Sequence, residues 1–347
     1  MKRKVIALTK ETRRAKCVPR IMDAIAPYLE LRSGDRVAIK INLSGSREIY
    51  ANTSYAAVES LIFYLKEQFG IREIAVIEGS DGAFFSNRST WEIFYKFRYK
   101  EVELNGARLV NLDELEHNET LPVHTLSGEH VVHFTRFDAD YLISVVPPKT
   151  HNIFPVSLSI PNLVGFVRPE ERVLMFGAPR NEMRRLSFSG NPRYFQLIDN
   201  AGRNFAALLE RITPNLVLID GLYGMEGKGP IKGSPVFHGF AAASEDAVQA
   251  DALATYVMGI NVNDVSYLKY AAEAGLGEMN WQNVIGVEPG QVKFPYRPHP
   301  LYPRQRCWLK HIGAGEASAP GAHANSTRRS GNRSSRRRRV DGAGRND

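Results

Sequence analysis

The sequence predicts an α/β protein with a largely parallel or mixed sheet and helices on both faces. The clearest observation is a strand–helix–strand unit. Residues 37–41 and 73–77 are short apolar runs, and residues 54–69 between them carry apolar side chains every three or four positions before Gly70. Two strands joined through a helix lie parallel, and a parallel sheet is covered on both faces. Further apolar runs and helical periodicities downstream extend the same pattern.

The remaining elements follow in order along the chain. The aromatic segment 90–100 is expected to be helical, and 141–146 reads as a buried strand that two prolines stop. The stretch 149–190 is expected to be mostly loop with short pieces of regular structure. Beyond it the sequence predicts helices at 192–211, 246–258 and 264–274, strands at 216–219 and 235–242, a glycine-rich loop between those strands, and an extended proline-containing strap over 295–303.

The 347 residues suffice for one large domain or two moderate ones. We expect a single α/β domain over 1–312, with a division into lobes at 1–140 and 141–312 as the alternative. From Gly313 the chain is mainly Gly, Ala, Ser, Asn and Arg, so a disordered basic tail is expected over 313–347. This tail holds eight arginines and three acids, a balance of +5 out of a total of +8. The rest is nearly neutral, so nucleic acid is expected as a partner only through the tail.

Cysteine content and hydropathy indicate the cellular compartment of the protein. The two cysteines, Cys17 and Cys307, are too few for a disulfide framework or for an iron–sulfur cluster held by this chain alone. No apolar run approaches the roughly 18 residues of a membrane helix, and the apolar run 5–8 is too short for a signal peptide. The sequence therefore predicts a cytoplasmic protein with no membrane partner, and it leaves the oligomeric state open.

Polar residues follow four of the predicted strands. They are Lys40 and Asn42 at strand 37–41, Glu78 at 73–77, Lys149, His151 and Asn152 after 141–146, and Asp220 at 216–219. In open parallel sheets, ligands bind outside the carboxyl ends of the strands. We therefore expect these side chains to look into one shared hollow at that edge of the sheet.

Each of these residues also has a plainer structural explanation. Lys40 alternates with isoleucines and can reach solvent at a sheet edge, Glu78 can be a turn acid, and the loop at 149–152 can be capped by its own polar groups. The functional hypothesis gives the two lysines an anionic ligand and gives Glu78 a hard cation. His151 is a candidate general base, metal ligand or phosphate donor. Downstream, Asn162 and Gly165 offer an amide and a flexible glycine.

The segment from Asp220 to Gly233 is the most specific one. An acid ends a predicted strand, and five glycines fall within the next 13 residues. The segment is neither a Walker A motif nor a Rossmann fingerprint. The backbone amides near Gly227 and Gly229 are candidates for holding an oxyanion, with Glu226 close by; the alternative is a flexible hairpin.

Asp251 lies in an apolar helical stretch, between Ala250 and Leu253. An acid in such a position needs a cation or several hydrogen-bond donors. Together with Asp220, Glu226 and Glu78, it is a candidate ligand for Mg²⁺ or Mn²⁺, since hard cations prefer oxygen ligands.

Taken together, these segments resemble the domain of unknown function 362 family over roughly residues 35–290. The motifs are Lys-x-Asn at the first strand, Pro-Lys-x-His at 148–151, Asn-x-x-Gly at 162–165, Asp-Gly…Met-Glu-Gly-x-Gly-Pro at 220–230 and Asp-x-Val-x-x-Asp at 246–251. The resemblance implies the α/β fold and the strand-end site, while the activity of the family is generally unknown. The family pattern has a lysine before the asparagine of Asn-x-x-Gly, where this chain has Pro161. Some relatives carry a ferredoxin-like cysteine cluster, which this chain lacks.

Three functions are compatible with these features. The first is a metal-assisted enzyme acting on a small carboxylate or phosphate, in which Lys40 and Lys149 hold the anion and His151 moves a proton. Asn42, Asn152 and Asn162 would bind the substrate. The second is a redox accessory protein without its own iron–sulfur cluster, suggested by the cluster-bearing relatives. The third is a ligand-binding module that uses the same hollow without catalysis.

Overall fold

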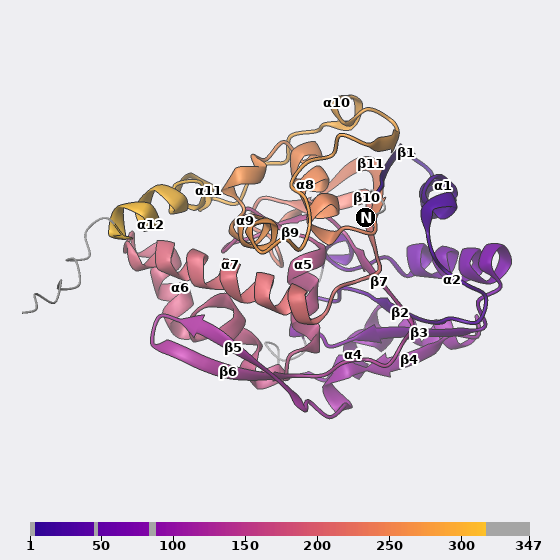
Figure 1. The fold of residues 1–347 in the computed structure, drawn as a ribbon, viewed down its shortest axis with the longest axis horizontal. Coiled ribbons are helices and arrows are strands. Elements are labelled where there is room, and N and C mark those ends of the chain that lie inside the picture. Colours follow the sequence, from indigo (N-terminus) through magenta and orange to yellow (C-terminus); the bar gives the residue numbers. More distant parts are fainter. Residues whose placement is uncertain (1–3, 45–47, 83–87, 317–347) are drawn as a thin grey trace, which may run out of the picture.

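The computed structural model describes residues 4–44, 48–82 and 88–316. A ten-stranded mixed sheet forms the centre of this part of the chain, with the strand order β12-β1-β11-β10-β7-β2-β3-β4 (Figure 1). Off this path, β8 pairs with β10, and β9 pairs with β8. The strands of the sheet are β1 (Ile6–Lys10), β2 (Arg36–Lys40), β3 (Glu73–Glu78), β4 (Arg108–Asn111), β7 (Tyr141–Val146), β8 (Lys149–Thr150), β9 (Val156–Ser157), β10 (Leu216–Glu226), β11 (Ser234–Ser244) and β12 (Val284–Gly286). A separate hairpin consists of β5 (Glu119–Thr125) and β6 (Gly128–Phe134).

Most strand pairs in the sheet are parallel, which confirms the predicted α/β class. Strand β2 pairs in parallel with β3 and with β7, and β7 pairs in parallel with β10. The antiparallel neighbours are β11 with β1 and with β10, and β8 with β9. The carboxyl ends of β2, β3, β7 and the first part of β10 therefore lie at one edge of the sheet.

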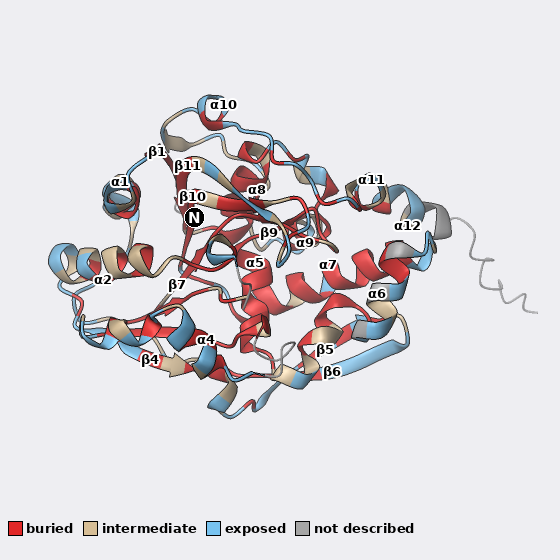
Figure 2. Ribbon diagram, turned by 180° about the vertical axis from the view of Figure 1, so that it is seen from behind, coloured by how far each residue is buried: buried red, intermediate tan, exposed pale blue. Residues whose placement is uncertain are grey.

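Helices cover both faces of the sheet (Figures 1 and 2). One face packs on α1 (Arg14–Ile25), α2 (Tyr55–Phe69) and α4 (Thr90–Lys96). The other face packs on α5 (Ser159–Asn162), α7 (Arg193–Arg211), α8 (Ala247–Val257) and α9 (Ser266–Glu273). Further α-helices in the described residues are α6 (Arg180–Phe188), α10 (Pro289–Val292), α11 (Tyr302–Gln305) and α12 (Trp308–Glu316).

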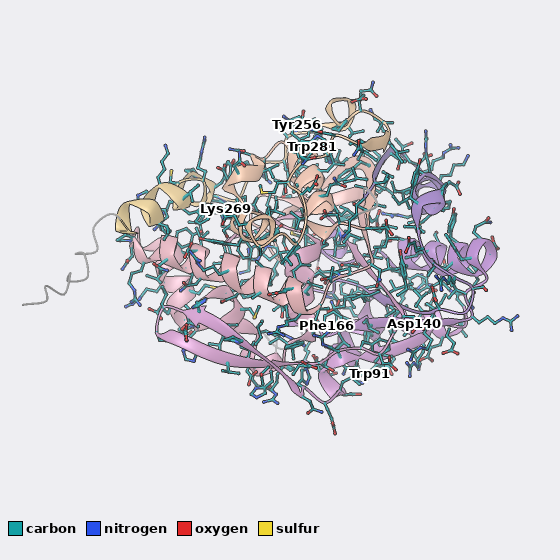
Figure 3. All side chains as sticks on the ribbon, viewed as in Figure 1. Trp91, Asp140, Phe166, Tyr256, Lys269 and Trp281 are labelled. Carbon is teal, nitrogen blue, oxygen red and sulfur yellow. The ribbon has the colours of Figure 1, made fainter. Side chains whose placement is uncertain are left out.

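The local signals explain several element ends. Ser54 precedes α2 in extended backbone, and Gly70 ends that helix with φ 67°, a left-handed conformation that suits glycine. Within β3 the residues before Glu78 are all buried except the first, as expected of a strand covered on both faces. Trp281 packs on Tyr256 of α8 with ring centroids 4.9 Å apart, and both lie at the top of the molecule (Figure 3).

The prediction of a glycine-rich loop directly after residue 219 is wrong. Strand β10 continues to Glu226 and forms a long antiparallel ribbon with β11, with a register shift between Gly221 and Tyr223. These glycines permit close packing, because a Cβ at Gly221 would lie 2.1 Å from the Phe240 ring and one at Gly224 would lie 2.4 Å from the Tyr296 hydroxyl. The true loop is confined to residues 227–233.

The C-terminal expectations are met in part. An extended strap precedes α11, as the prolines predict. Residues 313–316 belong to α12 rather than to a disordered tail, and the rest of the predicted tail, 317–347, lies outside the described residues. No helix in the described part of the chain is long and apolar enough to cross a membrane.

Candidate functional site

A pocket of roughly 210 Å³ lies at the carboxyl ends of the parallel strands; we call it the inner pocket. Its polar lining comes from the strand-end loops and from α5, and its apolar lining comes mainly from the segments around them. The polar members include Asn42, Glu78, Asp81, Lys149, His151, Asn152 and Asn162, and the apolar ones include Pro161, Val164, Phe176, Met183 and Ile231. The strand-end residues of β2, β3 and β7 thus meet at one cavity, as their positions predict.

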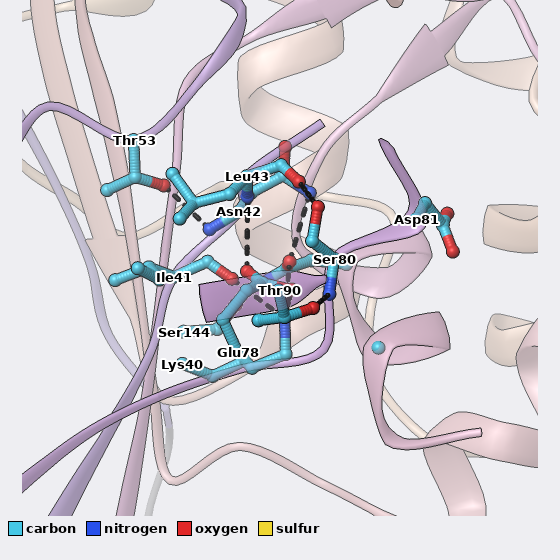
Figure 4. A network of polar contacts seen from close by, with 12 residues as sticks. Lys40, Ile41, Asn42, Leu43, Thr53, Glu78, Ser80, Asp81, Thr90 and Ser144 are labelled. Carbon is cyan, nitrogen blue, oxygen red and sulfur yellow. Dashed lines mark hydrogen bonds and ion pairs between the residues drawn. The ribbon is translucent and has the colours of Figure 1, made fainter. Parts of the chain in front are cut away.

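Lys40 lies behind this pocket rather than in its wall. Its side chain is fully buried, and the ammonium donates to the Ile41 carbonyl at 2.7 Å and to Glu78 Oε1 at 3.0 Å (Figure 4). The ammonium also donates to Asn162 Oδ1 at 3.0 Å. Burial lowers the pKa of Lys40 and raises that of Glu78 to about 7, while their mutual attraction opposes both shifts. Because its three N–H groups are all used, Lys40 orients Glu78 and Asn162 and is not free to hold a substrate.

Two asparagines connect Lys40 to the pocket wall. Asn162 Oδ1 accepts hydrogen bonds from Lys40 Nζ and from Asn42 Nδ2, the latter at 3.1 Å, and Asn162 Nδ2 donates to Ser144 Oγ at 3.1 Å. Asn42 Oδ1 in turn accepts from Lys149 Nζ at 2.5 Å. The lysine N–H groups donate to the oxygens of both amides, so the orientation of each amide is determined by its neighbours. The result is a continuous polar chain from Glu78 to Lys149.

Lys149 places its amine at the pocket wall. The residue is 2% exposed, and Nζ also donates to the Ala51 carbonyl at 2.9 Å. Within the described residues the amine thus has two hydrogen-bond partners, which leaves a third position on the nitrogen for a ligand. Burial lowers the pKa of Lys149 to about 7. Near neutral pH this amine can therefore exist in both protonation states.

His151 is held as a neutral ring. Its Nδ1 accepts from the backbone N–H of Ile153 at 3.0 Å, so the ring proton is on Nε2. The imidazole stacks with Phe154 and Phe176, with ring centroids 5.7 and 5.8 Å apart. Burial lowers the pKa of His151 to about 3. This geometry favours a hydrogen-bond donor at Nε2 over the general base that the sequence suggests.

The loop that carries His151 is fixed by a distant part of the chain. Gln305 of α11 donates its side-chain amide to the carbonyls of His151 at 2.9 Å and Phe154 at 3.0 Å. Gln305 is itself buried. The backbone of the pocket wall is therefore held by the C-terminal segment.

Two glycines allow the loop after β3 to approach the segment after α5. A Cβ at Gly79 would lie 2.2 Å from the Gly165 carbonyl oxygen, and a Cβ at Gly165 would lie 2.8 Å from that of Gly79. The buried Arg172 donates to the Gly165 carbonyl at 3.1 Å and to Asp113. Beside it, Asp81 Oδ1 lies 3.9 Å from Arg172 Nε and has no hydrogen-bond partner among the described residues. Burial raises the pKa of this carboxyl.

Asp220 does not join the inner pocket, contrary to the expectation of a common hollow. Side chains alternate along β10, so Asp220 shares its face of the sheet with Leu216 and Leu218, which pack toward α1. There it accepts two hydrogen bonds from Arg14 Nη1, at 2.6 and 2.7 Å, and one from the Cys17 thiol at 3.8 Å. The carboxylate is thus paired on the opposite face.

The glycine loop does not offer the expected amides. The N–H of Gly227 donates to the Arg297 carbonyl at 2.7 Å, and that of Gly229 donates to the Gly227 carbonyl at 2.9 Å. Glu226 accepts from the Arg297 N–H at 2.8 Å. A Cβ at Gly229 would lie 2.1 Å from the Thr150 carbonyl oxygen, so this glycine serves close packing against β8.

Asp251 belongs to a structural network. Its carboxylate accepts from the N–H of Ser159 at 2.9 Å, from the Ser159 hydroxyl at 2.6 Å and from the N–H of Ile160 at 3.0 Å. It therefore caps the start of α5, the helix that presents Asn162. Burial raises the pKa of Asp251 to about 7.

The four carboxylates suggested as metal ligands are not assembled into one site. Glu78 lines the inner pocket, whereas Asp220, Glu226 and Asp251 each have the separate protein partners described above. Across residues 4–44, 48–82 and 88–316, no group of three His, Cys, Asp or Glu side chains could share a metal ion. The four carboxylates therefore do not come together as the magnesium or manganese ligands that the sequence suggests.

Sequence reasoning missed several residues that shape the pocket. Ser144 orients Asn162 and could have been noticed as the polar residue in an otherwise apolar strand. Pro161 forms part of the wall at the position where the family pattern has a lysine. Arg172 and Gln305 carry no local sequence signal, because their roles depend on contacts with segments far along the chain.

Comparison with known proteins gives matches that differ in sequence identity and in the share of the chain that they cover. A relative, the thylakoid-associated protein sll1697 of Synechocystis, is 24% identical over 255 residues, which cover 71% of this chain and 70% of the relative. Among solved structures, the lactate racemase apoprotein from Thermoanaerobacterium thermosaccharolyticum aligns with a TM-score of 0.41 and 13% identity, over 61% of this chain and 50% of that one. The chain thus spans half the length of that structure, and so weak a likeness transfers no activity.

The family match covers more than half of the chain and includes the pocket. Residues 37–256 match the family described as Domain of unknown function (DUF362). This range contains Lys40, Glu78, Lys149, His151 and Asn162, together with the strands and the short helix that position them. The chain therefore belongs to the Domain of unknown function (DUF362) family.

Proposed function

We propose that the protein is an enzyme that binds a small anionic molecule in the inner pocket and transfers a proton there. The observation that carries this proposal is the Lys149 amine. It lies at the pocket wall, Asn42 Oδ1 and the Ala51 carbonyl hold it in place, and one position on its nitrogen is left for a ligand. At roughly 210 Å³ the cavity is smaller than the roughly 300–1,000 Å³ of pockets for drug-sized ligands, which suits a small metabolite.

The chemistry follows from the two protonation states of this amine. As an ammonium, Lys149 attracts a carboxylate or phosphate; as a free amine it accepts a proton from a carbon next to a carbonyl group. The electron pair of the broken C–H bond then forms a carbon–carbon double bond, and the π pair of the carbonyl moves onto its oxygen. The Nε2–H of His151 is the neutral donor suited to that oxygen, and the reverse transfer returns the proton.

The remaining polar residues hold this arrangement in place. Lys40 and Asn162 orient Asn42, and Asn42 orients the Lys149 amine. Asn152 also lines the pocket and is a candidate contact for the substrate. Such a supporting shell is what keeps a reactive amine within the tolerance that proton transfer needs.

Proton exchange in D₂O tests the proposal directly. Wild-type protein, incubated with pyruvate, 2-oxoglutarate and oxaloacetate in turn, should accelerate loss of the ¹H signal from the carbon next to the keto group of one of them. Lys149→Met should abolish the acceleration and weaken binding. Lys149→Arg should retain binding but lose exchange, because a guanidinium stays protonated at neutral pH.

An exposed lysine provides the matched control. Lys16→Met removes the same charge from the surface of α1 and should leave exchange and binding unchanged. Ligand-induced melting shifts that depend on Lys149 without any exchange would instead indicate a non-catalytic binding module. Elemental analysis of protein purified without chelator tests the metal hypothesis: stoichiometric magnesium or manganese that is lost in Glu78→Gln would replace the lysine mechanism with a metal-assisted one.

A further inference from the structure

A second cavity of about 500 Å³ adjoins the inner pocket; we call it the outer pocket. The two cavities share Asn152, Pro230 and Ile231 in their linings, so these residues stand between them. The outer pocket is also lined by Lys228, Lys232 and His299. The 227–233 loop between β10 and β11 therefore faces both cavities.

The outer pocket is a cationic site with no counter-charge in its lining. Lys228 and Lys232 are exposed, and neither forms an ion pair within the described residues. His299 Nδ1 accepts from the Leu301 N–H at 3.1 Å, so its proton is on Nε2. Burial, followed by the positive charge of Lys228, lowers the pKa of His299 to about 4. The outer pocket thus combines two ammonium groups with one neutral donor.

The inner pocket has a different balance of charge. Lys149 is the one lysine or arginine in its described lining, and the acids Glu78 and Asp81 line the same cavity. The cation at this end is therefore partly offset by acids, whereas the cations of the outer pocket are not.

The loop that carries the two lysines is anchored at Gly227 and closed by a hydrogen bond within the loop. Gly227 donates to the Arg297 carbonyl, and the Lys232 N–H donates to the Lys228 carbonyl at 3.1 Å. The Thr150 hydroxyl donates to the Gly227 carbonyl at 3.0 Å, which joins the loop to the strand that begins with Lys149. The outer lysines are thus attached to the same framework as the inner one, which is the condition for recognising two groups at a set separation.

We propose that the ligand carries two anionic groups. Lys149 binds one of them in the inner pocket, and Lys228 and Lys232 bind the other in the outer pocket. This inference rests on the proposed function and names its substrate class: a short dicarboxylate, or a carboxylic acid with a phosphoryl group at its other end. The reacting carbon lies at the Lys149 end, and the second acidic group anchors the molecule from outside.

Isothermal titration with a series of defined probes tests this assignment. Butyrate carries one carboxylate; succinate, glutarate and adipate carry two at increasing separation; 3-phosphonopropionate carries a phosphonate in place of one of them. One of the doubly charged probes should bind wild-type protein roughly three- to tenfold more tightly than butyrate, which is the scale of partly exposed charge pairs. This advantage should decrease as salt is raised.

Two variants separate this inference from the proposed function. Lys228→Gln with Lys232→Gln should remove the advantage of the doubly charged probes and leave butyrate binding unchanged, whereas Lys16→Gln should alter neither. Lys149→Met should weaken all the probes together. Equal affinity for butyrate and every doubly charged probe, with binding still dependent on Lys149, would overturn the two-group inference and leave the proposed function standing. Absence of binding for all probes at millimolar concentration would overturn both.

Discussion

The two faces of the central sheet end in polar clusters of opposite kinds. On one face, Lys40, Asn162 and Asn42 lead to a lysine amine that opens onto a cavity. On the other face, the Asp220 carboxylate is paired with Arg14 through both of its oxygens, at the edge of a separate cavity. Position at the end of a strand determines the edge at which a side chain lies, and alternation along the strand determines its face. Only residues that satisfy both conditions reach the same pocket.

The largest effect is expected from breaking the polar chain at Lys40. Lys40→Met leaves Glu78 buried without its counter-charge and should lower the free energy of unfolding by about 3–5 kcal/mol. The double variant Lys40→Met, Glu78→Gln removes both charges and should recover most of that loss. Urea denaturation followed by circular dichroism measures both. A single variant as stable as wild type would mean that Glu78 is solvated or neutral.

Asp251 should matter to both stability and the pocket. In Asp251→Asn an amide N–H₂ faces the N–H of Ile160, and we expect a loss of about 2 kcal/mol for the unmade hydrogen bond. Asp246→Asn is the matched control, since this buried Asp accepts from the N–H groups of Gln249 and Glu278 in the same manner. Both should destabilise the fold, but only Asp251→Asn should weaken ligand binding, because it alone loosens the helix that carries Asn162. Equal ligand binding by the two variants would mean that the start of α5 does not influence the pocket.

The pH dependence should show which form of Lys149 reacts. Since the pKa of Lys149 is lowered to about 7, the exchange rate should rise with pH up to that value and then level off. Anion binding should change in the opposite direction as the ammonium is lost. A rate that falls between pH 6 and roughly 8 would exclude the free amine as the base.

The same group links folding to pH. The folded state holds fewer protons than the unfolded one between the lowered pKa of about 7 and the ordinary 10.5, so the contribution of Lys149 to stability increases with pH across that window and is lost as pH falls through it. Lys149→Met should flatten this dependence, and Lys16→Met should not. Denaturation curves at a series of pH values measure the difference.

The smallest loss of stability is expected for a substitution of Asp220, on the sheet face that packs against α1. Asp220→Asn weakens a partly buried ion pair and should cost about 1–2 kcal/mol of stability, with no change in binding or exchange at the inner pocket. Thermal denaturation and titration with the same ligand measure the two quantities. Loss of binding in this variant, at unchanged stability, would show that the two faces are coupled.

The sequence predicts the fold class and half of the site for the same reason. Strands β2, β3 and β7 are short apolar runs with polar residues directly after them, so both their parallel arrangement and the meeting of Lys40, Asn42, Glu78 and Lys149 follow from local pattern. The face of the sheet on which Asp220 lies cannot be predicted in this way. Strand β10 is apolar on both faces, so its sequence shows no alternation of polar and apolar residues.

Other features depend on long-range packing. Gly221 and Gly224 look like loop residues, yet aromatic groups of β11 and of the C-terminal strap fill the space above them and allow the strand to continue. Helix α1 includes Pro19, which argues against a helix in sequence terms, and neither it nor β1 was predicted. The hairpin of β5 and β6 was also missed; residues such as Val123 and Phe134 show their role only when packed in the core.

The hydrogen bonds from Gln305 to the carbonyls of His151 and Phe154 span more than 150 positions of sequence. During synthesis the chain emerges from its N-terminus onward, so the strands and the lysines are available long before the residue that secures the histidine loop. Until that residue has left the ribosome, the nascent protein can have a folded sheet but not a finished pocket.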